Sequence, residues 1–140
     1  MNYDDNNIFA KILRKEIPSN VIFEDEHTVS IMDVMPQSDG HALILPKEPS
    51  INLLEASVES LAHCMKTVQI IAKASLQAFE ADGVVIRQFN HEAAGQTVFH
   101  THFHVIPRYE GLPLKGHAVE MADGDLLKQH ADKYIAVLNG

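Results

Sequence analysis

The stretch from residue 96 to residue 108 reads Gln96-Thr97-Val98-Phe99-His100-Thr101-His102-Phe103-His104-Val105-Ile106-Pro107-Arg108, and three histidines alternate within it. Because alternate residues of a β-strand share one face, we expect the three imidazoles to line one side and point outward while Thr101, Phe103 and Val105 pack inward. With a rise of about 3.3 Å per residue, neighbouring imidazoles would lie about 7 Å apart and the outer pair about 13 Å apart. The stretch therefore predicts a half-buried strand over residues 97–106 that displays a histidine cluster.

The rest of the chain predicts four further strands. Two β-rich runs over residues 21–23 and 28–32 are separated by a short polar connection, which is typical of a hairpin. A turn-rich cluster precedes a third strand over residues 41–45, and Pro46 ends it. A fourth strand is expected over residues 84–89. The short connections favour antiparallel pairing of these strands.

Helical periodicity appears in three places. A short N-terminal helix is indicated by Ile8, Phe9, Ile12 and Leu13, and a C-terminal helix by Leu126, Leu127, His130, Tyr134, Ile135 and Leu138. Between them, an apolar stripe predicts a helix of about six turns that begins after Ser57. The stripe consists of Val58, Leu61, Met65, Val68, Ala72, Leu76 and Phe79. We therefore predict an α+β fold, in which one long helix covers a five-stranded antiparallel sheet.

Composition and charge narrow the class of protein. The chain has 140 residues, of which 46% are hydrophobic and 21% charged, so we expect one domain over residues 1–140. The single cysteine, Cys64, allows no internal disulfide and favours a reducing compartment. A formal net charge of −8 argues against binding to long nucleic acids. Without a signal-peptide pattern or an apolar run of membrane length, a cytoplasmic protein that does not bind membranes is expected.

The histidine cluster has three interpretations. A solvated polar face normally carries Lys, Glu, Thr or Ser, so three alternating histidines disfavour it. A zinc site requires ring nitrogens only about 3–3.5 Å apart, which a straight strand cannot provide for all three rings; a further ligand would have to come from His41, His91, Glu92 or elsewhere. Nucleophilic catalysis at phosphorus suits the cluster, because neutral imidazole attacks without first losing a proton and its phosphorylated form is readily displaced by water.

Four segments of the chain resemble the histidine-triad (HIT) family of nucleotide-binding proteins and hydrolases. The segment from Gln96 to Arg108 is similar to the family signature, in which three histidines alternate with apolar residues. The other three are Ile8-Phe9-Ala10-Lys11-Ile12 with Ile17-Pro18, Ile31-Met32-Asp33 with Pro36, and Gly40-His41-Ala42-Leu43-Ile44-Leu45-Pro46-Lys47. The resemblance implies the family fold, a five-stranded antiparallel sheet crossed by a long helix, and a homodimer.

The resemblance also implies roles for individual residues. His102 would be the nucleophile that attacks the α-phosphorus, His104 would hydrogen-bond the phosphate, and His100 would support the orientation of His102. His41 matches a further family histidine beside the triad. Asn90 and the Gly95-Gln96-Thr97 turn match the phosphate-binding loop, and Asp33 corresponds to the carboxylate that binds the ribose hydroxyls. Ile8, Phe9 and Ile12 are candidates for the base pocket, with core packing as the alternative.

The chain departs from the family pattern at several positions. Many bacterial relatives hold a structural zinc at positions where this chain has Asn7, Ala10 and Pro49, so we expect no metal and no other cofactor. Thr101 is only partly apolar where the signature is hydrophobic, and we expect it to pack weakly. The similarity covers about residues 8–108. The extension over residues 109–140 diverges, and in the family this region helps to set substrate preference.

The resemblance implies a nucleotidyl hydrolase. Its expected reaction is cleavage of the α-phosphate bond of a purine nucleoside 5′-phosphoramidate, such as an adenosine phosphoramidate, through a covalent nucleotidyl-histidine intermediate. One alternative is a dinucleoside polyphosphate hydrolase, which would use the same nucleophile on a longer substrate. Another is a nucleotide-binding regulatory module in which catalysis is vestigial.

Overall fold

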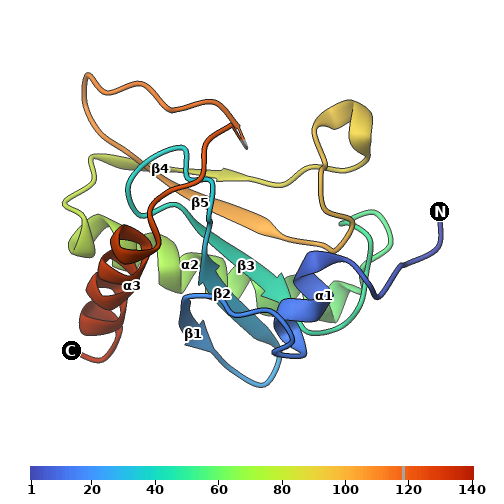
Figure 1. The fold of residues 1–140 in the computed structure, drawn as a ribbon. Helices are drawn as coiled ribbons and strands as arrows, with labels where there is room; N and C mark the ends of the chain where they lie inside the picture. The colour runs from blue at the N-terminus through green and yellow to red at the C-terminus, as the bar shows by residue number, and fades with distance from the viewer. Residues whose placement is uncertain (118) are drawn as a thin grey trace.

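A single five-stranded sheet organises the computed structural model, which describes residues 1–117 and 119–140 (Figure 1). Its strand order is β1-β2-β3-β5-β4, and all neighbouring strands are antiparallel. The strands are β1 (Val21–Glu24), β2 (Thr28–Met32), β3 (Ala42–Pro46), β4 (Gly83–Arg87) and β5 (Phe103–Arg108). The predicted α+β fold with an antiparallel sheet is confirmed, and β1 and β2 form the predicted hairpin.

The predicted fifth strand was wrong at its N-terminal end. β5 begins at Phe103, so His100 and His102 lie in the irregular segment before it, and only His104 lies within the strand. The reason is an alternative set of hydrogen bonds. The Thr101 backbone N–H donates to the Ser50 carbonyl at 2.9 Å, and the two side-chain hydroxyls lie 2.6 Å apart. The segment is therefore tied to the loop after β3, and Thr101 is fully buried by polar contacts.

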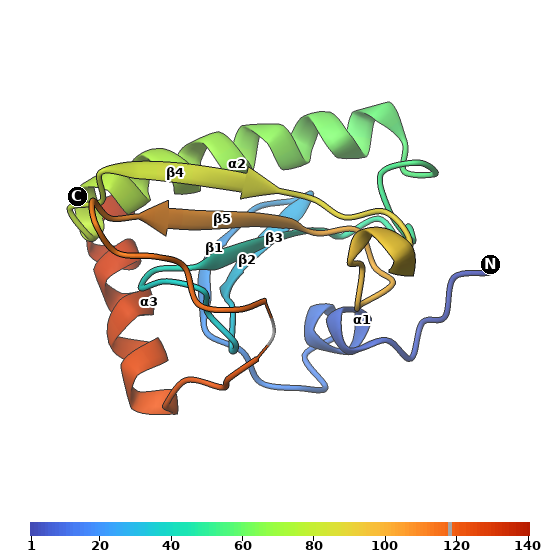
Figure 2. The same ribbon diagram turned by 90° about the horizontal axis from the view of Figure 1, so that it is seen from above.

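Two helices cover one face of the sheet. Figure 2 shows α2 (Val58–Ala78) running along this face, and α3 (Gly124–Leu138) packs against α2 and β1. The core between them contains Ile44, Val105 and Ile71, all fully buried. Tyr134 of α3 is also fully buried and donates its hydroxyl to the Gly40 carbonyl at 2.5 Å. The last helix therefore contributes to the same core as the sheet.

The predicted long helix is present with the expected N-cap, because the Ser57 side chain accepts the Ser60 N–H. The predicted buried stripe was wrong for several residues, since Val58, Met65 and Leu76 are exposed. The buried face is rotated around the helix and consists of Ser60, Cys64, Thr67, Val68, Ile71, Ala74 and Ser75. Small and hydroxyl side chains form much of it, because α2 lies directly on the sheet.

The opposite face of the sheet is partly covered by α1 (Ile8–Leu13), whose N-cap is Asn7. A second apolar cluster lies here, formed by Phe9, Val29, Ile31, Leu43 and Leu45. Since His41 and His104 share this side with Leu43 and Leu45, the sheet separates a closed core from a face that carries the imidazoles. No helix in the described part of the chain has both the length and the apolar character of a membrane span.

Candidate functional site

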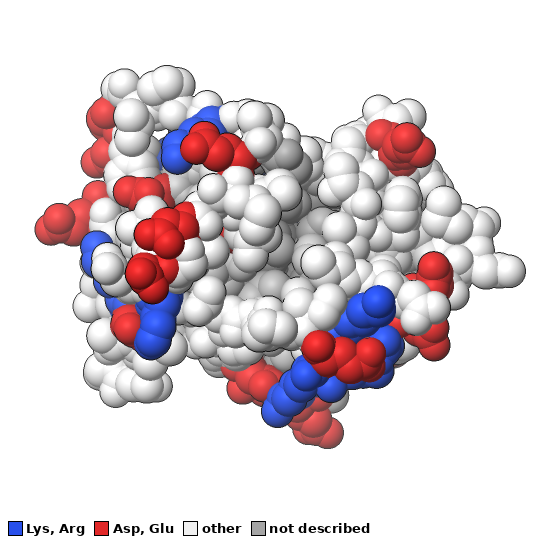
Figure 3. Space-filling view, viewed as in Figure 1, with Lys and Arg blue, Asp and Glu red and all other residues white. Residues whose placement is uncertain are grey.

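A cavity of about 240 Å³ lies between α1, the sheet and the segment before β5. Its walls are largely apolar and include Ile8, Phe9, Ile12, Ile31 and Leu43. Its polar lining includes Asp33, Thr97, His102, His104 and His117. Figure 3 shows this face of the molecule hollowed near its centre, where side chains other than Lys, Arg, Asp and Glu form the surface. An apolar cavity with a few convergent polar groups is the usual form of a small-molecule site.

The imidazole of His102 is held in one tautomer. Its Nδ1 lies 2.6 Å from the His100 carbonyl, which can only accept, so Nδ1 carries the proton. Nε2 then has a free lone pair, and it has no hydrogen-bond partner among the described residues. The ring of Phe9 packs edge-on against this imidazole at a centroid distance of 4.8 Å. His102 therefore presents an oriented, neutral imidazole with an unpaired ring nitrogen beside the ring of Phe9.

His104 is held in the opposite tautomer through His41. The backbone N–H of Gln37 donates to His41 Nδ1 at 3.0 Å, so the proton of the neutral His41 ring is on Nε2. That N–H points to His104 Nδ1 at 2.9 Å, which must accept it. His104 consequently carries its proton on Nε2, which is buried and has no partner within the described part of the chain. A hydrogen-bond donor without a protein acceptor is thus available at the cavity.

Burial keeps these imidazoles neutral. Desolvation lowers the pKa of His102 to about 4, and the hydrogen bond to the His100 carbonyl opposes this only in part. Desolvation, with smaller contributions from neighbouring positive charges, lowers the pKa of His41 to about 3 and that of His104 to about 2. The prediction that the triad points outward to solvent was therefore wrong. His102 is 6% exposed and His104 is 3% exposed, although both line the cavity.

The carboxylate of Asp33 lies beside the two linked imidazoles. Its Oδ1 accepts the Met35 N–H at 2.8 Å, and its Oδ2 lies 3.2 Å from His41 Nε2. Burial raises the pKa of Asp33 to about 6, against the lowering effect of the Met35 hydrogen bond. An acidic group that titrates near neutrality can accept or donate hydrogen bonds at the cavity wall.

The cluster of Asp33, His41 and His104 has the size of a metal site, but its hydrogen bonds do not fit one. The three potential ligand atoms are separated by 2.9, 3.2 and 3.8 Å, close to the roughly 3.4 Å expected around tetrahedral zinc. Because Gln37 donates to His41 Nδ1, however, His41 Nε2 carries a proton and cannot ligate a metal. At the position of the family zinc, Asn7 caps α1 by accepting the Ala10 N–H.

His100 lies behind the cavity. Its Nε2 donates to the Pro46 carbonyl at 2.8 Å, so its Nδ1 accepts the hydroxyl proton of Tyr3 at 2.6 Å. Since the carbonyl of His100 holds His102 Nδ1, this residue connects the N-terminal segment to the oriented imidazole. Burial lowers the pKa of His100 as well, so the ring is an uncharged support.

The structure brings together seven of the residues proposed from the sequence around the cavity: Ile8, Phe9, Ile12, Asp33, Thr97, His102 and His104. His41 and His100 support the site from behind. The ring centres of His102 and His104 lie 5.2 Å apart, closer than the spacing of about 7 Å that a regular strand gives to alternate residues. The difference arises because His102 lies outside the regular strand.

The remaining three proposed residues do not line the cavity. Gln96 is 2% exposed, and its amide bonds internally to His91, Asn52, Ile51 and Val98. The Asn90 side chain accepts the Leu53 N–H at 3.0 Å and bonds to Gln88. Gly95, with φ +103°, ends a short 3₁₀ helix (Glu92–Ala94) near Phe89. These residues shape the loop that carries Thr97, and their contact with phosphate remains a prediction.

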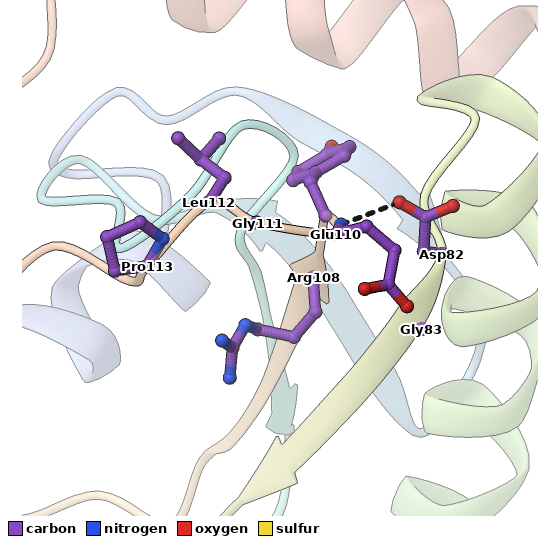
Figure 4. Close-up of a pocket in the computed structure, with 8 residues that line it drawn as sticks. Asp82, Gly83, Arg108, Glu110, Gly111, Leu112 and Pro113 are labelled. Carbon is purple, nitrogen blue, oxygen red and sulfur yellow. Dashed lines mark hydrogen bonds between the residues drawn. The ribbon is translucent and has the colours of Figure 1, made fainter.

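Two residues at the site have no distinctive sequence pattern. Tyr3 precedes the first helix, and His117 lies in the turn-rich region after β5, where no periodicity assigns a direction to a side chain. A larger groove of about 460 Å³ lies elsewhere, around Asp82, Arg108 and Glu110 (Figure 4). In it the Glu110 N–H donates to Asp82, and the Arg108 side chain points away from that pair. The groove contains no imidazole, so the histidine cavity is the better candidate for chemistry.

Comparison with known proteins finds similar sequences and structures. The crystal structure of a Hit-like protein involved in cell-cycle regulation from Bartonella henselae is similar, with a TM-score of 0.91 and 48% identity, over 97% of this chain and 99% of that one. Protein hit of Bacillus subtilis (strain 168) is 38% identical over 134 residues, which are 96% of this chain and 87% of that protein. Adenylylsulfatase HINT3 of Arabidopsis thaliana is 39% identical over 103 residues, which are 74% of this chain and 52% of that protein.

Residues 14–111 also match the HIT domain family. The matched region contains β1–β5, α2 and all three alternating histidines, while Tyr3 and His117 lie outside it. Together with the relatives above, this match shows that the chain belongs to the HIT family.

Proposed function

We propose that the protein is a nucleotidyl hydrolase that acts on purine nucleoside 5′-phosphoramidates through a covalent intermediate on His102. The observation that carries this proposal is the pair of adjacent imidazoles in opposite tautomers. His102 offers a lone pair at Nε2, and His104, whose ring centre is 5.2 Å away, offers an N–H at Nε2. A nucleophile beside a donor for a phosphate oxygen is what displacement at phosphorus needs.

In this mechanism the buried environment of His102 is an advantage. Its low pKa keeps the imidazole neutral, so the lone pair is available without a base. When Nε2 forms a bond to the α-phosphorus, the ring becomes cationic, and the His100 carbonyl stabilises the proton on Nδ1. His104 donates to a phosphate oxygen and draws its orientation from His41. The bonds of His102 to the His100 carbonyl and of His41 to His104 are in place before substrate binds, which limits reorganisation in the transition state.

The cavity walls support a nucleoside as the bound group. Aliphatic and aromatic side chains of α1, including Ile8, Phe9 and Ile12, provide a surface for a planar base, and Asp33 offers a carboxyl group for ribose hydroxyls. A cavity of about 240 Å³ favours one nucleotide with a small leaving group over a dinucleotide. The similarity to a protein named adenylylsulfatase supports the same class of reaction, transfer of an adenylyl group from a small leaving group.

The proposal is tested by trapping the intermediate. Wild-type protein mixed with an adenosine 5′-phosphoramidate and quenched rapidly should gain the mass of one adenylyl group, located on His102 by peptide mapping. His102→Ala should form no adduct and should lose activity by a factor on the order of 10⁴ to 10⁶. His63→Ala, on α2 and outside the cavity, is the matched control. If His102→Ala turns over substrate like the wild type, the enzyme proposal fails.

Substrate class is tested by direct comparison. Under the proposal, kcat/KM for the adenosine phosphoramidate exceeds that for diadenosine polyphosphates, because the cavity accommodates one nucleoside. The reverse preference would identify a dinucleoside polyphosphate hydrolase. Binding of AMP without an adduct or turnover of either substrate would identify a regulatory module.

We also propose a homodimer, with the enzyme acting in the cytoplasm. The support for dimerisation is an unpaired sheet edge at β4, where Ile86 is 43% exposed, together with the exposed apolar residues Val58, Met65 and Leu76 of α2. A free edge strand beside exposed apolar side chains is a common subunit interface. Light scattering should give the mass of two chains, and Ile86→Lys should shift it toward one. A monomeric wild type at micromolar concentration would contradict the proposal.

A further inference from the structure

The segment after β5 delivers a third imidazole to the cavity, in addition to those of His102 and His104. We refer to residues 109–123 as the C-terminal segment; all but its first three residues lie beyond residues 14–111, the region that matches the family. Two anchors hold it on the loop after β2. The Lys115 N–H donates to the Gln37 carbonyl at 2.8 Å, and the Ala122 N–H donates to the Val34 carbonyl at 2.9 Å. His117 lies between these anchors and lines the cavity.

The contacts of His117 place it next to the phosphate donor. Its ring packs edge-on against His104 at a centroid distance of 5.7 Å and lies 5.4 Å from the ring of Phe89. Its Nε2 is buried and has no hydrogen-bond partner among the described residues. His104 thus touches both His102, at 5.2 Å, and His117. A phosphate bonded to His104 Nε2–H lies within reach of the imidazoles of both neighbours.

Departure of an amine from phosphorus requires a proton, and the other cavity imidazoles cannot supply it. His102 uses Nε2 as the nucleophile. The only ring proton of His104 is engaged in a hydrogen bond to a phosphate oxygen. His41 is fully buried behind His104 and bonds to it and to Gln37. The low pKa of each of these three rings excludes a second proton near neutral pH. His117 is only half-buried and is flanked by the exposed Gly116, so its ring lies closer to solvent than those of His41, His102 and His104.

We propose that His117 is the catalytic acid and base at the leaving group, an inference that rests on the proposed function. In the first step, His102 Nε2 bonds to the α-phosphorus while the bond from phosphorus to the amine nitrogen breaks. The electron pair of that bond stays on the nitrogen, which takes a proton from protonated His117. The products are the free amine, neutral His117 and nucleotidyl-His102, in which the imidazolium charge balances the phosphate charge.

In the second step, neutral His117 accepts one proton from the attacking water. The oxygen of that water bonds to phosphorus, and the bond between phosphorus and His102 breaks with its electron pair returning to Nε2. This releases the nucleoside monophosphate and leaves His117 protonated for the next turnover. One group therefore serves both steps, as general acid and then as general base.

The test uses two substrates that share the nucleotide and differ in the leaving group. One is an adenosine 5′-phosphoramidate of an alkylamine, which needs a proton to leave. The other is the p-nitrophenyl ester of AMP, whose phenolate leaves without one. His117→Gln keeps hydrogen-bonding capacity but transfers no proton. We expect kcat/KM for the alkylamide to fall by about 10²–10⁴-fold. The rate of His102 adenylylation by the ester and the Kd for AMP should remain those of the wild type.

His117→Ala and His63→Gln complete the design. His117→Ala should reproduce the selective loss on the alkylamide, and His63→Gln should leave both substrates unaffected because His63 lies on α2. An equal loss of adenylylation rate on both substrates would overturn the proposal and assign His117 to phosphate positioning. No loss on either would also overturn it. If wild-type protein forms no adduct on His102 with either substrate, the proposed function itself fails, which is a separate outcome.

Discussion

The imidazoles of His102 and His41 are each oriented by one backbone group. The His100 carbonyl fixes the proton of His102 on Nδ1, and the Gln37 N–H fixes that of His41 on Nε2. Both are main-chain atoms, whose donor or acceptor character does not change with pH. The tautomer of His102 is therefore set by the backbone, whereas that of His104 also depends on the side chain of His41, which connects it to the Gln37 N–H.

Tyr3 provides the most direct test at the scale of a residue. Tyr3→Phe removes the hydrogen bond to His100 Nδ1, so we expect unfolding free energy to fall by about 0.5–1.5 kcal/mol. We also expect kcat to fall with little change in KM, because the His100 carbonyl orients the imidazole of His102, the proposed nucleophile, and the ¹⁵N shifts of the His100 ring should change. Tyr109→Phe is the control, since its hydroxyl donates to the Asp39 carbonyl. Equal losses of kcat in both variants would contradict a positioning role.

Most secondary-structure elements could be predicted from periodicity and turn residues, because those signals are local. The hairpin, β3, β4, the Ser57 cap and the three helices all follow from patterns of two or three to four residues. The start of β5 could not be predicted, because Thr101 forms hydrogen bonds with Ser50, some fifty residues earlier in the chain, in place of hydrogen bonds within the sheet. The same local rules gave no signal for His117, whose position depends on the anchors of the C-terminal segment.

The buried face of α2 was predicted wrongly, because the prediction rested only on the hydropathy of the side chains. Polar Thr67 is fully buried, since its hydroxyl lies 2.6 Å from that of Thr28 in β2, whereas apolar Leu76 is 44% exposed. A helix that lies close on a sheet selects small side chains, and their hydroxyls are satisfied across the interface. The presence of α2 could thus be predicted from the sequence. Which side of the helix is buried could not, because that depends on the surface of the sheet against which it packs.

This rotation leads to a prediction at the scale of an element. Ile71→Ala should lower the free energy of unfolding by about 2–5 kcal/mol, because Ile71 is fully buried against the sheet. Leu76→Ala on the outer side should lower it by about 0.5 kcal/mol or less. Urea denaturation of the two variants measures the difference. Similar losses of stability in the two variants would mean that the apolar stripe that includes Val58 and Leu76 faces the core.

Across the whole molecule, the buried imidazoles make stability depend on pH. Unfolded histidines take up protons as pH falls through about 6.5, whereas His41, His102 and His104 stay neutral down to pKa values of about 3, 4 and 2 in the folded protein. The unfolded state therefore binds more protons below about pH 6.5, and stability falls with pH. Asp33 acts in the opposite direction, because its folded pKa of about 6 exceeds its ordinary value of 3.8. Because the three histidines lower the free energy of unfolding on acidification and Asp33 alone among these four groups raises it, the net effect is a loss of stability.

Urea unfolding measured from about pH 7.5 to about pH 4.5 should show this decline in the free energy of unfolding. Asp33→Asn should make the decline steeper between about pH 6 and pH 4, because it removes a carboxyl group whose pKa is higher in the folded protein than in the unfolded chain. A stability that is flat or rises on acidification would show that the cavity imidazoles are accessible to protons in the folded protein.

Gln37 connects the loop after β2 to the C-terminal segment, two parts of the molecule that could otherwise change independently during evolution. Its N–H sets the proton on His41, its carbonyl receives the Lys115 N–H, and its side-chain amide donates to the Lys115 carbonyl at 3.0 Å. Replacing the C-terminal segment with that of a relative would therefore also disturb the hydrogen bonds that run from Gln37 through His41 to His104. For chimaeric proteins built to acquire a new leaving-group preference, the loop over residues 34–37 and the segment over residues 109–123 form the unit to transplant together.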